Sequence, residues 1–354
     1  MQLARLTGRT GMRTLAGMST ISFHRLPQRL QRRLPSIDEA PRARAADLVP
    51  GGIYLGDARV LLPRITPASV ALSVWSPPYF VGKDYECHMS FAEWQALLRD
   101  VIRLHYDVIR PGGFLAINIA DILCYKDDSM PRIQAEAVGK RRSSVSRADV
   151  VRAIAAHPRA KRRQLAQILG CSEQTVDRRL NGNNIRGGKY QPQTRIKIVG
   201  GLIEAYALAA GFYPYDRRVW VKDPAWQNGR WTSLSYRAVD EFEYIYVFWK
   251  PGITTIDRRR LTAEEWKRWG SRAVWSFPSV RDNRDHESKF PLELPRRVIR
   301  LLTDPGDIVL DCFLGSGTTA VAAIEGRRRY IGIEIRKASV ELARRRVSAA
   351  RAGR

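Results

Sequence analysis

Short apolar runs alternate with amphipathic stretches from about residue 52 onward. The runs at 53–55, 70–75 and 114–119 predict strands, and the stretch 91–109 has apolar residues at helical spacing. This helix is expected to stop at Pro111-Gly112-Gly113. A strand, a helix and another strand in this order make a crossover unit. The sequence therefore predicts an α/β domain built around a mostly parallel sheet.

The second half of the chain continues this pattern. A helix ending at Gly211 precedes the runs 217–221 and 244–249, which predict an antiparallel hairpin. Further on come a helix over 292–302, a strand at 308–310, a glycine-rich turn, a helix of small residues and a strand at 330–333. We expect residues 51–125 and 198–350 to form one domain.

Positive charge is extreme and unevenly spread. The formal net charge is +25 at pH 7, and residues 1–46 and 126–197 carry +7 and +11 of it. Such an excess favours a polyanionic partner, nucleic acid before membrane. There is no run of about 18 apolar residues, so no membrane-spanning helix is expected. The scattered cysteines match no metal or disulfide spacing, which predicts a protein of the reducing cytoplasm without a metal site.

Residues 1–50 are expected to be a basic, disordered extension. They are rich in Arg and nearly free of acidic residues, as transit peptides are, but lack the apolar core of a secretory signal. A true start at Met12 or Met18 is an alternative interpretation.

The first motif with chemical meaning is the turn DCFLGSGTT at 311–319, between an apolar strand and an Ala-rich helix. Gly315 and Gly317 allow a ligand to approach the backbone where the helix begins and N–H groups are free. Glu334 ends the next strand, where a carboxylate can accept both hydroxyls of a ribose. The dinucleotide fingerprint has a third glycine and normally opens its domain, so a nicotinamide enzyme fits poorly. Alone, this motif also fits an ordinary strand-turn-helix.

The second motif is Ser76-Pro77-Pro78-Tyr79, directly after the strand at 70–75. In open α/β sheets, chemistry gathers at the carboxyl ends of strands. The two prolines remove N–H donors, so carbonyl oxygens and the Ser76 hydroxyl remain to accept hydrogen bonds from an amino group. Tyr79 offers a flat face on which a base taken out of the helix can stack. In isolation, a rigid proline turn with a buried Tyr is the simpler interpretation.

Together, the two motifs resemble the β class of DNA amino-methyltransferases, in which the catalytic half precedes the cofactor loop. The likeness covers most of residues 52–350. It implies a Rossmann-like fold dependent on S-adenosylmethionine, with a mixed seven-stranded sheet and circularly permuted motif order. One departure is Cys312, where the family commonly has Pro; this is expected to alter loop stiffness more than cofactor contacts.

The resemblance also assigns roles to residues. Ser76, Pro77, Pro78 and Tyr79 would hold the target base. The cofactor residues it implies are Asp57 near the adenine, Phe290 and Pro291 as a cover, Glu334 on the ribose, and Asp311, Phe313, Gly315, Gly317 and Thr318 around the methionine part.

Methylation of cytosine C5 needs a Cys nucleophile, typically in a Pro-Cys dipeptide, and this chain has none. Methylation of an exocyclic amine needs only in-line placement of nitrogen and methyl sulfonium. Ser at the first motif position is associated in the family with cytosine N4, and Asp with adenine N6. We therefore expect N4-methylation of cytosine in double-stranded DNA by base flipping. A restriction–modification role beside a cognate endonuclease is one interpretation, and an orphan methyltransferase without such a partner is the other. Adenine N6, an RNA or protein acceptor, and a non-catalytic DNA-binding regulator are the alternatives.

Residues 126–197 interrupt a strand-helix connection and read as an inserted module. Leu165, Ala166 and Leu169 share a helix face, Gly170 permits a turn, and Ser172 can cap a second helix. This spacing resembles a helix-turn-helix, completed by an upstream helix at 148–156; a generic basic helical hairpin is the alternative. The residues predicted to contact DNA are Lys161, Arg162, Arg163, Ser172, Gln174, Arg178 and Asn181.

Overall fold

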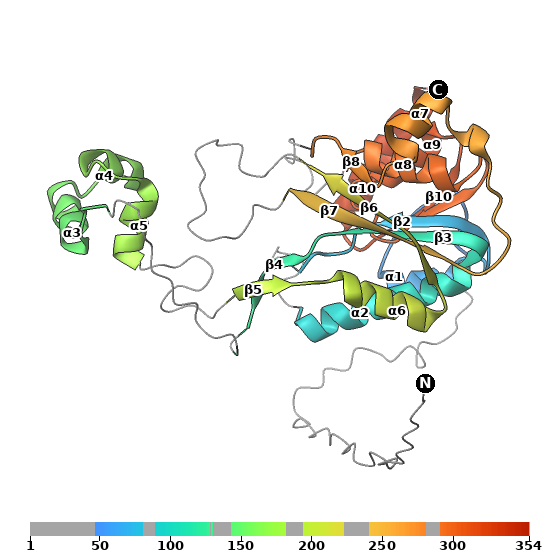
Figure 1. Ribbon diagram of the computed structural model, residues 1–354, viewed down its shortest axis with the longest axis horizontal. Coiled ribbons are helices and arrows are strands. Elements are labelled where there is room, and N and C mark those ends of the chain that lie inside the picture. The colour runs from blue at the N-terminus through green and yellow to red at the C-terminus, as the bar shows by residue number, and fades with distance from the viewer. Residues whose placement is uncertain are drawn as a thin grey trace, which may run out of the picture. The chain divides into compact units, whose positions relative to one another are not determined.

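The computed structural model describes residues 47–80, 89–127, 129, 143–181, 194–222, 241–280 and 291–353 (Figure 1). The predicted N-terminal extension falls almost wholly outside this set. Leu48, however, is only 3% exposed, and its N–H donates to the carbonyl of Arg64 at 3.0 Å. Burial of this apolar side chain places the start of the folded domain before residue 51, earlier than the sequence predicted.

Within the described residues, eight strands form one sheet in the order β1-β10-β9-β2-β3-β7-β6-β8. The first five are mutually parallel, β7 is antiparallel to both of its neighbours, and β8 is parallel to β6. The strands are β1 Ile53–Leu55, β2 Val70–Trp75, β3 Ile109–Ile119, β6 Tyr213–Val221, β7 Phe242–Trp249, β8 Val274–Ser276, β9 Ile308–Asp311 and β10 Arg329–Glu334.

The expected seven-stranded sheet is wrong by one strand, because β8 adds an eighth. Its central residue, Trp275, is 1% exposed, and its indole Nε1 donates to the carbonyl of Trp269 at 2.9 Å. Its sequence, Val-Trp-Ser, was not among the apolar runs from which strands were predicted. The predicted hairpin is confirmed as β6 and β7, although β6 begins four residues before the expected run.

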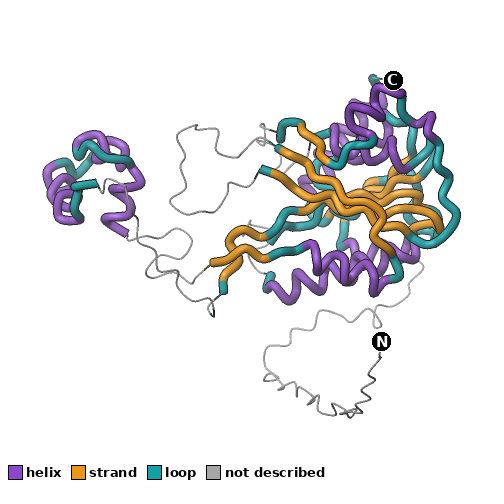
Figure 2. The backbone as a smooth tube through the Cα atoms, viewed as in Figure 1, coloured by secondary structure: helices purple, strands orange, loops and turns teal. Residues whose placement is uncertain are grey.

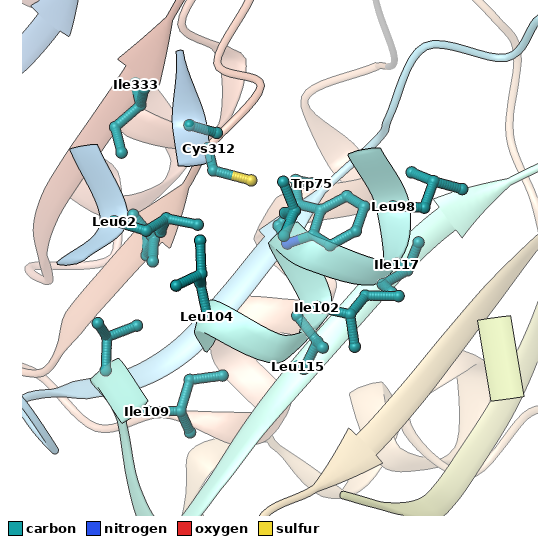
Figure 3. Close-up of a cluster of buried hydrophobic side chains, with 14 of the residues drawn as sticks. Leu62, Trp75, Leu98, Ile102, Leu104, Ile109, Leu115, Ile117, Cys312 and Ile333 are labelled. Carbon is teal, nitrogen blue, oxygen red and sulfur yellow. The ribbon is translucent and has the colours of Figure 1, made fainter. Parts of the chain in front are cut away.

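Helices cover both faces of the sheet (Figures 1 and 2). Side chains alternate along β3: Leu115, Ile117 and Ile119 pack with one helix layer, and Phe114 and Ala116 with the other. Figure 3 shows the first of these cores, which includes Trp75 and Cys312. The first layer holds α1 Ala58–Leu61, a 3₁₀ turn Leu62–Arg64, α2 Phe91–Val108 and α6 Gly200–Ala210; the second holds α8 Glu293–Leu302, α9 Thr318–Glu325 and α10 Lys337–Ala352.

The Pro111-Gly112-Gly113 segment lies inside β3 and not at a helix end as predicted. Helix α2 already ends at Val108, and the pairing of β2 with β3 shifts register across this segment, which forms a bulge. Gly112 has φ +79°, and a Cβ there would lie 1.9 Å from the carbonyl oxygen of Ile253. The bulge therefore requires glycine on both conformational and steric grounds.

Replacing Gly112 with Ala is expected to lower the free energy of unfolding well beyond the roughly 1–2 kcal/mol that a left-handed backbone costs an L-residue. Gly306→Ala is the matched control, since Gly306 has φ +88° but open space around its Cβ position. Urea unfolding of both variants measures the difference. An equal loss of unfolding free energy in the two variants would show that the contact with Ile253 is not tight.

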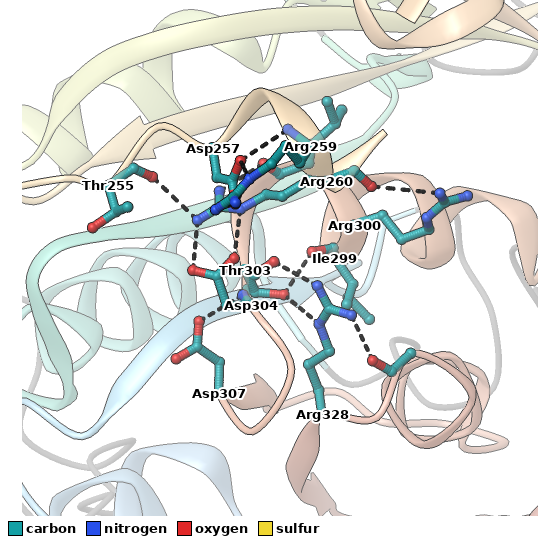
Figure 4. A network of polar contacts seen from close by, with 12 residues as sticks. Thr255, Asp257, Arg259, Arg260, Ile299, Arg300, Thr303, Asp304, Asp307 and Arg328 are labelled. Atoms are coloured by element: carbon teal, nitrogen blue, oxygen red, sulfur yellow. Dashed lines mark hydrogen bonds and ion pairs between the residues drawn. The ribbon is translucent and has the colours of Figure 1, made fainter. Parts of the chain in front are cut away.

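A polar network ties residues 255–260 to the loop before β9 (Figure 4). Arg260 donates to both carboxylate oxygens of Asp304, at 2.7 and 2.8 Å, and to the carbonyl of Leu301. Arg328 donates to the hydroxyl and the carbonyl of Thr303. This network holds the 250–280 region, which contains a 3₁₀ turn Arg258–Arg260, α7 Ala263–Glu265 and a π-helical turn Trp266–Gly270.

The insert contains three helices at the predicted places: α3 Arg147–Ala156, α4 Arg162–Ile168 and α5 Glu173–Asn181. Ser146 and Asp149 cap α3 reciprocally, Gly170 has φ +59° in the turn after α4, and the Ser172 hydroxyl accepts from Thr175 N–H. Val150, Ala153, Leu165, Ala166 and Val176 form its core. At its base, β4 Ile122–Lys126 pairs antiparallel with β5 Thr194–Lys197, so the ribbon begins four residues before the predicted boundary.

Candidate active site

The parallel strands bring the predicted site segments to one edge of the sheet. Leu55 pairs with Glu334, and Gly332 pairs with Asp311 in the neighbouring strand. Ser73, three residues before Ser76, pairs with Leu310. The order of the strands along the sheet changes direction between β9 and β2. Ligands bind at such switch points in open α/β sheets. The glycine loop follows one of these two strands and Ser76 follows the other.

The proline motif is held by its neighbours on both sides. The Trp94 indole Nε1 donates to the carbonyl of Pro78 at 2.7 Å. The Ser76 hydroxyl lies 2.8 Å from the Tyr79 hydroxyl and 3.0 Å from the carbonyl oxygen of Asn118, on β3. Asn118 is 1% exposed, and its side-chain N–H donates to the backbone carbonyl of Tyr244. The motif therefore presents hydroxyl and carbonyl oxygens in a fixed arrangement, as an amino group requires.

Sequence reasoning missed Glu243 and Lys222. The Tyr79 hydroxyl donates to Glu243 Oε2 at 2.8 Å, and Lys222 Nζ lies 2.7 Å from Glu243 Oε1. Glu243 is 8% exposed. It precedes the run that predicted β7 and lies 164 residues from Tyr79 in the sequence, so no local pattern predicts the contact.

The glycine loop is fastened to the end of β10. Gly315 N–H donates to Glu334 Oε2 and Arg336 N–H to Oε1, both at 2.8 Å. Gly315 and Gly317 have φ +54° and +85°, and a Cβ on Gly317 would lie 2.9 Å from the Ala343 Cβ on α10. The two glycines are therefore required by backbone conformation, and Glu334 both shapes the loop and faces the ligand edge.

Asp311 is the most unusual titratable group of the site. It is 1% exposed; its Oδ1 accepts from Phe313 N–H, and its Oδ2 has no hydrogen-bond partner among the described residues. Burial raises the pKa of Asp311 to about 7, against the opposing effects of the nearby Thr319 hydroxyl and the Phe313 N–H. A buried carboxylate oxygen without a donor at this edge suits a cationic group such as a substrate ammonium. Cys312 points into the core instead, and burial raises the pKa of its thiol.

The hydroxyl of Thr318 is already engaged. Arg346, on α10, donates to the carbonyl and hydroxyl of Ser316 and to the Thr318 hydroxyl at 3.1 Å. The Thr318 hydroxyl accepts this bond and keeps its own hydrogen to donate, so a contact with a cofactor would come from that O–H or from the backbone at the start of α9. Sequence reasoning did not identify Arg346 as a support of this loop.

The structure says less about three further residues that were predicted to bind the cofactor. Asp57 follows β1 and caps α1, where it accepts from Arg59 N–H and pairs with the Arg59 guanidinium. The hydrogen bonds from Arg59 outweigh burial and hold the pKa of Asp57 below its usual value. Pro291 lies in the turn before α8, and Phe290 falls outside the described residues.

The residues predicted to contact DNA differ in their surroundings. Lys161 and Arg163 are exposed, whereas Arg162 forms an ion pair with Asp177 at 2.8 Å. The Ser172 hydroxyl caps α5. The side chains of Gln174, Arg178 and Asn181 are not among those described. Arg162 and Ser172 are thus partly committed to the fold of the insert.

The described residues hold neither a cluster of metal-ligand side chains nor a helix suited to a membrane. No three His, Cys, Asp or Glu side chains gather there as metal ligands would. No helix in the described part is long and apolar enough to cross a membrane.

A family model described as DNA methylase, for N6 and N4 methyltransferases, matches residues 70–345. The chain belongs to this family. Type II methyltransferase M.BglI of Bacillus subtilis is 56% identical to it over 292 residues, which are 82% of this chain and 84% of that relative. Membership confirms the predicted fold class and the dependence of this methylase on S-adenosylmethionine.

Solved structures agree with the fold of the methylase. A protein described as a DNA modification methylase from Thermus thermophilus, in complex with S-adenosyl-L-methionine, has a TM-score of 0.53 at 25% identity, covering 84% of this chain and 93% of that one. The cytosine-N4-specific PvuII DNA methyltransferase has a TM-score of 0.54 at 16% identity, covering 86% and 92%. The second likeness concerns the fold alone.

Proposed function

We propose that this methylase transfers a methyl group from S-adenosylmethionine to the exocyclic N4 of cytosine in double-stranded DNA. The observation that carries the proposal is the cluster of acceptor oxygens around Ser76, at the strand edge shared with the glycine loop. An amino group donating to these oxygens is oriented so that its nitrogen lone pair can face the methyl group. The choice of cytosine rests on Ser at the first position of the motif.

The residues present fit the cofactor. Its ammonium would be bound by Asp311, whose buried Oδ2 lacks a donor, and its ribose hydroxyls by Glu334, whose oxygens retain lone pairs beside two N–H groups. When bound, the cofactor supplies an electrophilic methyl group on a sulfonium. Phe313 packs edge-on against Trp75 at 5.3 Å between ring centroids, which joins the cofactor loop to the catalytic strand. Asp57, Phe290, Pro291 and Thr318 complete the proposed cofactor contacts.

Treatment of mixed-sequence DNA with the protein and labelled S-adenosylmethionine, followed by mass spectrometry of the nucleosides, tests the reaction. We expect labelled N4-methylcytosine. Labelled N6-methyladenine would reassign the base, and C5-methylcytosine alone would overturn the mechanism, because that reaction needs a nucleophilic Cys.

The proposed setting is a cytoplasmic type II restriction–modification pair, in which an endonuclease cuts the same site.

We further propose that the insert contacts the DNA duplex. The observations behind this are its net charge of +11 and a turn between α4 and α5 of the helix-turn-helix type. Exposed Lys161 and Arg163 lie at the start of α4 and offer positive charge to phosphates.

Arg163→Gln and Lys161→Gln are each expected to weaken binding to all DNA sequences alike and to reduce the salt dependence by about one phosphate contact. Arg162→Gln is the matched control, with a smaller effect because Asp177 already neutralises that guanidinium. Fluorescence anisotropy over a range of salt concentrations measures the slopes. Identical slopes for the wild type and the three variants would exclude this helix start as a phosphate contact.

A further inference from the structure

A chain of close polar contacts leads from the proposed base site into the protein. The Ser76 hydroxyl lies 2.8 Å from the Tyr79 hydroxyl, which donates to Glu243 Oε2 at 2.8 Å. Glu243 Oε1 in turn lies 2.7 Å from Lys222 Nζ. Glu243 is buried, and the Lys222 side chain is only 19% exposed. The two distances between oxygens, from Ser76 to Tyr79 and from Tyr79 to Glu243, permit proton transfer.

Methylation of an amine releases a proton that must leave the site. The nitrogen lone pair forms the N–C bond as the C–S bond breaks, and the bonding pair remains on sulfur as a neutral thioether. The nitrogen then carries a positive charge and an extra proton. An exocyclic ammonium on a base ring is a strong acid, so a carboxylate is a sufficient final acceptor.

We propose that Glu243 is this acceptor and receives the proton through Ser76 and Tyr79. The target nitrogen gives its proton to Ser76 Oγ, the Ser76 proton passes to the Tyr79 oxygen, and the Tyr79 proton passes to Glu243 Oε2. Ser76 and Tyr79 end neutral, as they began, and Glu243 ends protonated. The proposal rests on the amino-methyltransferase activity but holds for either cytosine or adenine.

Neighbouring groups are less suited to this role. Asn118 offers a carbonyl and an amide, neither of which holds a proton at neutral pH. Glu243 is the carboxylate in direct contact with Tyr79 in the described part of the chain, and its second oxygen forms an ion pair with Lys222. Lys222 is thus a positioning residue, which orients the carboxylate and keeps it ready to accept.

Single-turnover methyl transfer by Glu243→Gln tests the relay. The amide oxygen can still accept from Tyr79, but the side chain cannot take a proton, so a fall in rate of about 10²-fold is expected. Affinity for DNA and for S-adenosylmethionine should stay unchanged. Glu243→Ala should be equally slow, and added formate should restore its rate; formate should not help Glu243→Gln, in which the amide fills the space.

Transfer of label to DNA by the wild-type protein tests the proposed function in the same experiment. Failure of the proposed function can therefore be distinguished from failure of the relay. A Glu243→Gln enzyme as fast as the wild type would overturn the relay. So would a slow Glu243→Ala enzyme that retains its melting temperature and both affinities yet does not respond to formate.

Discussion

Asp311→Asn is expected to weaken S-adenosylmethionine binding by about 10–100-fold while raising the free energy of unfolding of the cofactor-free protein. The two effects share one cause. In the free protein, the Asp311 carboxylate is buried with one oxygen lacking a hydrogen-bond partner among the described residues, so ionising it costs stability. Once the cofactor binds, the same charge pairs with the ammonium. An amide of the same shape loses the ion pair and also removes the cost.

The pH dependence follows from the raised pKa of Asp311. An Asp that titrates at about 7 when folded and near 3.8 when unfolded holds its proton more tightly in the folded state. The free energy of unfolding therefore falls as pH rises from about 4 to about 7, by up to about 4 kcal/mol at 1.36 kcal/mol per pKa unit. Above pH 7 this contribution is constant. Cofactor affinity changes in the opposite direction, rising through pH 7 as the carboxylate ionises.

Thermal unfolding and calorimetric binding at several pH values between 5.5 and 8.5, which bracket this pKa on either side by roughly one and a half units, measure both trends. Asp257→Asn serves as the control: its partly exposed carboxylate pairs with Arg259, and the substitution should leave cofactor affinity unchanged. If Asp311→Asn bound the cofactor as tightly as the wild type at pH 8, the ammonium would have to be bound elsewhere.

Glu334→Ala is expected to reduce cofactor affinity by about 10²-fold or more while DNA binding remains nearly intact. The carboxylate accepts from Gly315 N–H and Arg336 N–H, so its removal leaves two donors unpaired and loosens the glycine loop. It also removes the acceptors proposed for the ribose. The residues proposed to contact DNA lie in the insert, in a different part of the sequence.

Glu325→Ala is the matched control for Glu334→Ala. Glu325 ends α9, far along the helix from the loop, and is paired with Arg296 at the surface. Calorimetry measures the affinity of each variant for S-adenosylmethionine, and fluorescence anisotropy over a range of salt concentrations measures its affinity for DNA. We expect only Glu334→Ala to lose affinity for the cofactor. Loss of DNA binding by a folded Glu334→Ala protein would contradict the assignment of the cofactor edge.

The strands and helices that position the site could be predicted because their signals are local. The strand before Ser76, the strand before Asp311 and the helices around them each follow from apolar spacing over a few consecutive residues. The turn glycines were recognisable for the same reason. That Gly315 and Ser76 lie at adjacent strand ends is shown by the pairing of β2 with β9 and not by a local signal.

Contacts that join distant segments could not be predicted in this way. Glu243 meets Tyr79, and Arg346 meets Ser316, across 164 and 30 residues, and no spacing rule relates such pairs. Leu48 was assigned to the extension because it precedes the Pro50-Gly51-Gly52 segment, after which the alternating pattern begins, yet its side chain is buried. The Pro111-Gly112-Gly113 segment carries a typical helix-stop signal, but the register of β2 against β3 uses it as a bulge.

The crystal structure of the protein with S-adenosylhomocysteine bound is the most direct test of the proposed site. We predict the cofactor ammonium against Asp311, the ribose hydroxyls on Glu334, and the sulfur facing the hydroxyl of Ser76. A cofactor bound away from the glycine loop, or with its sulfur turned away from Ser76, would contradict the account.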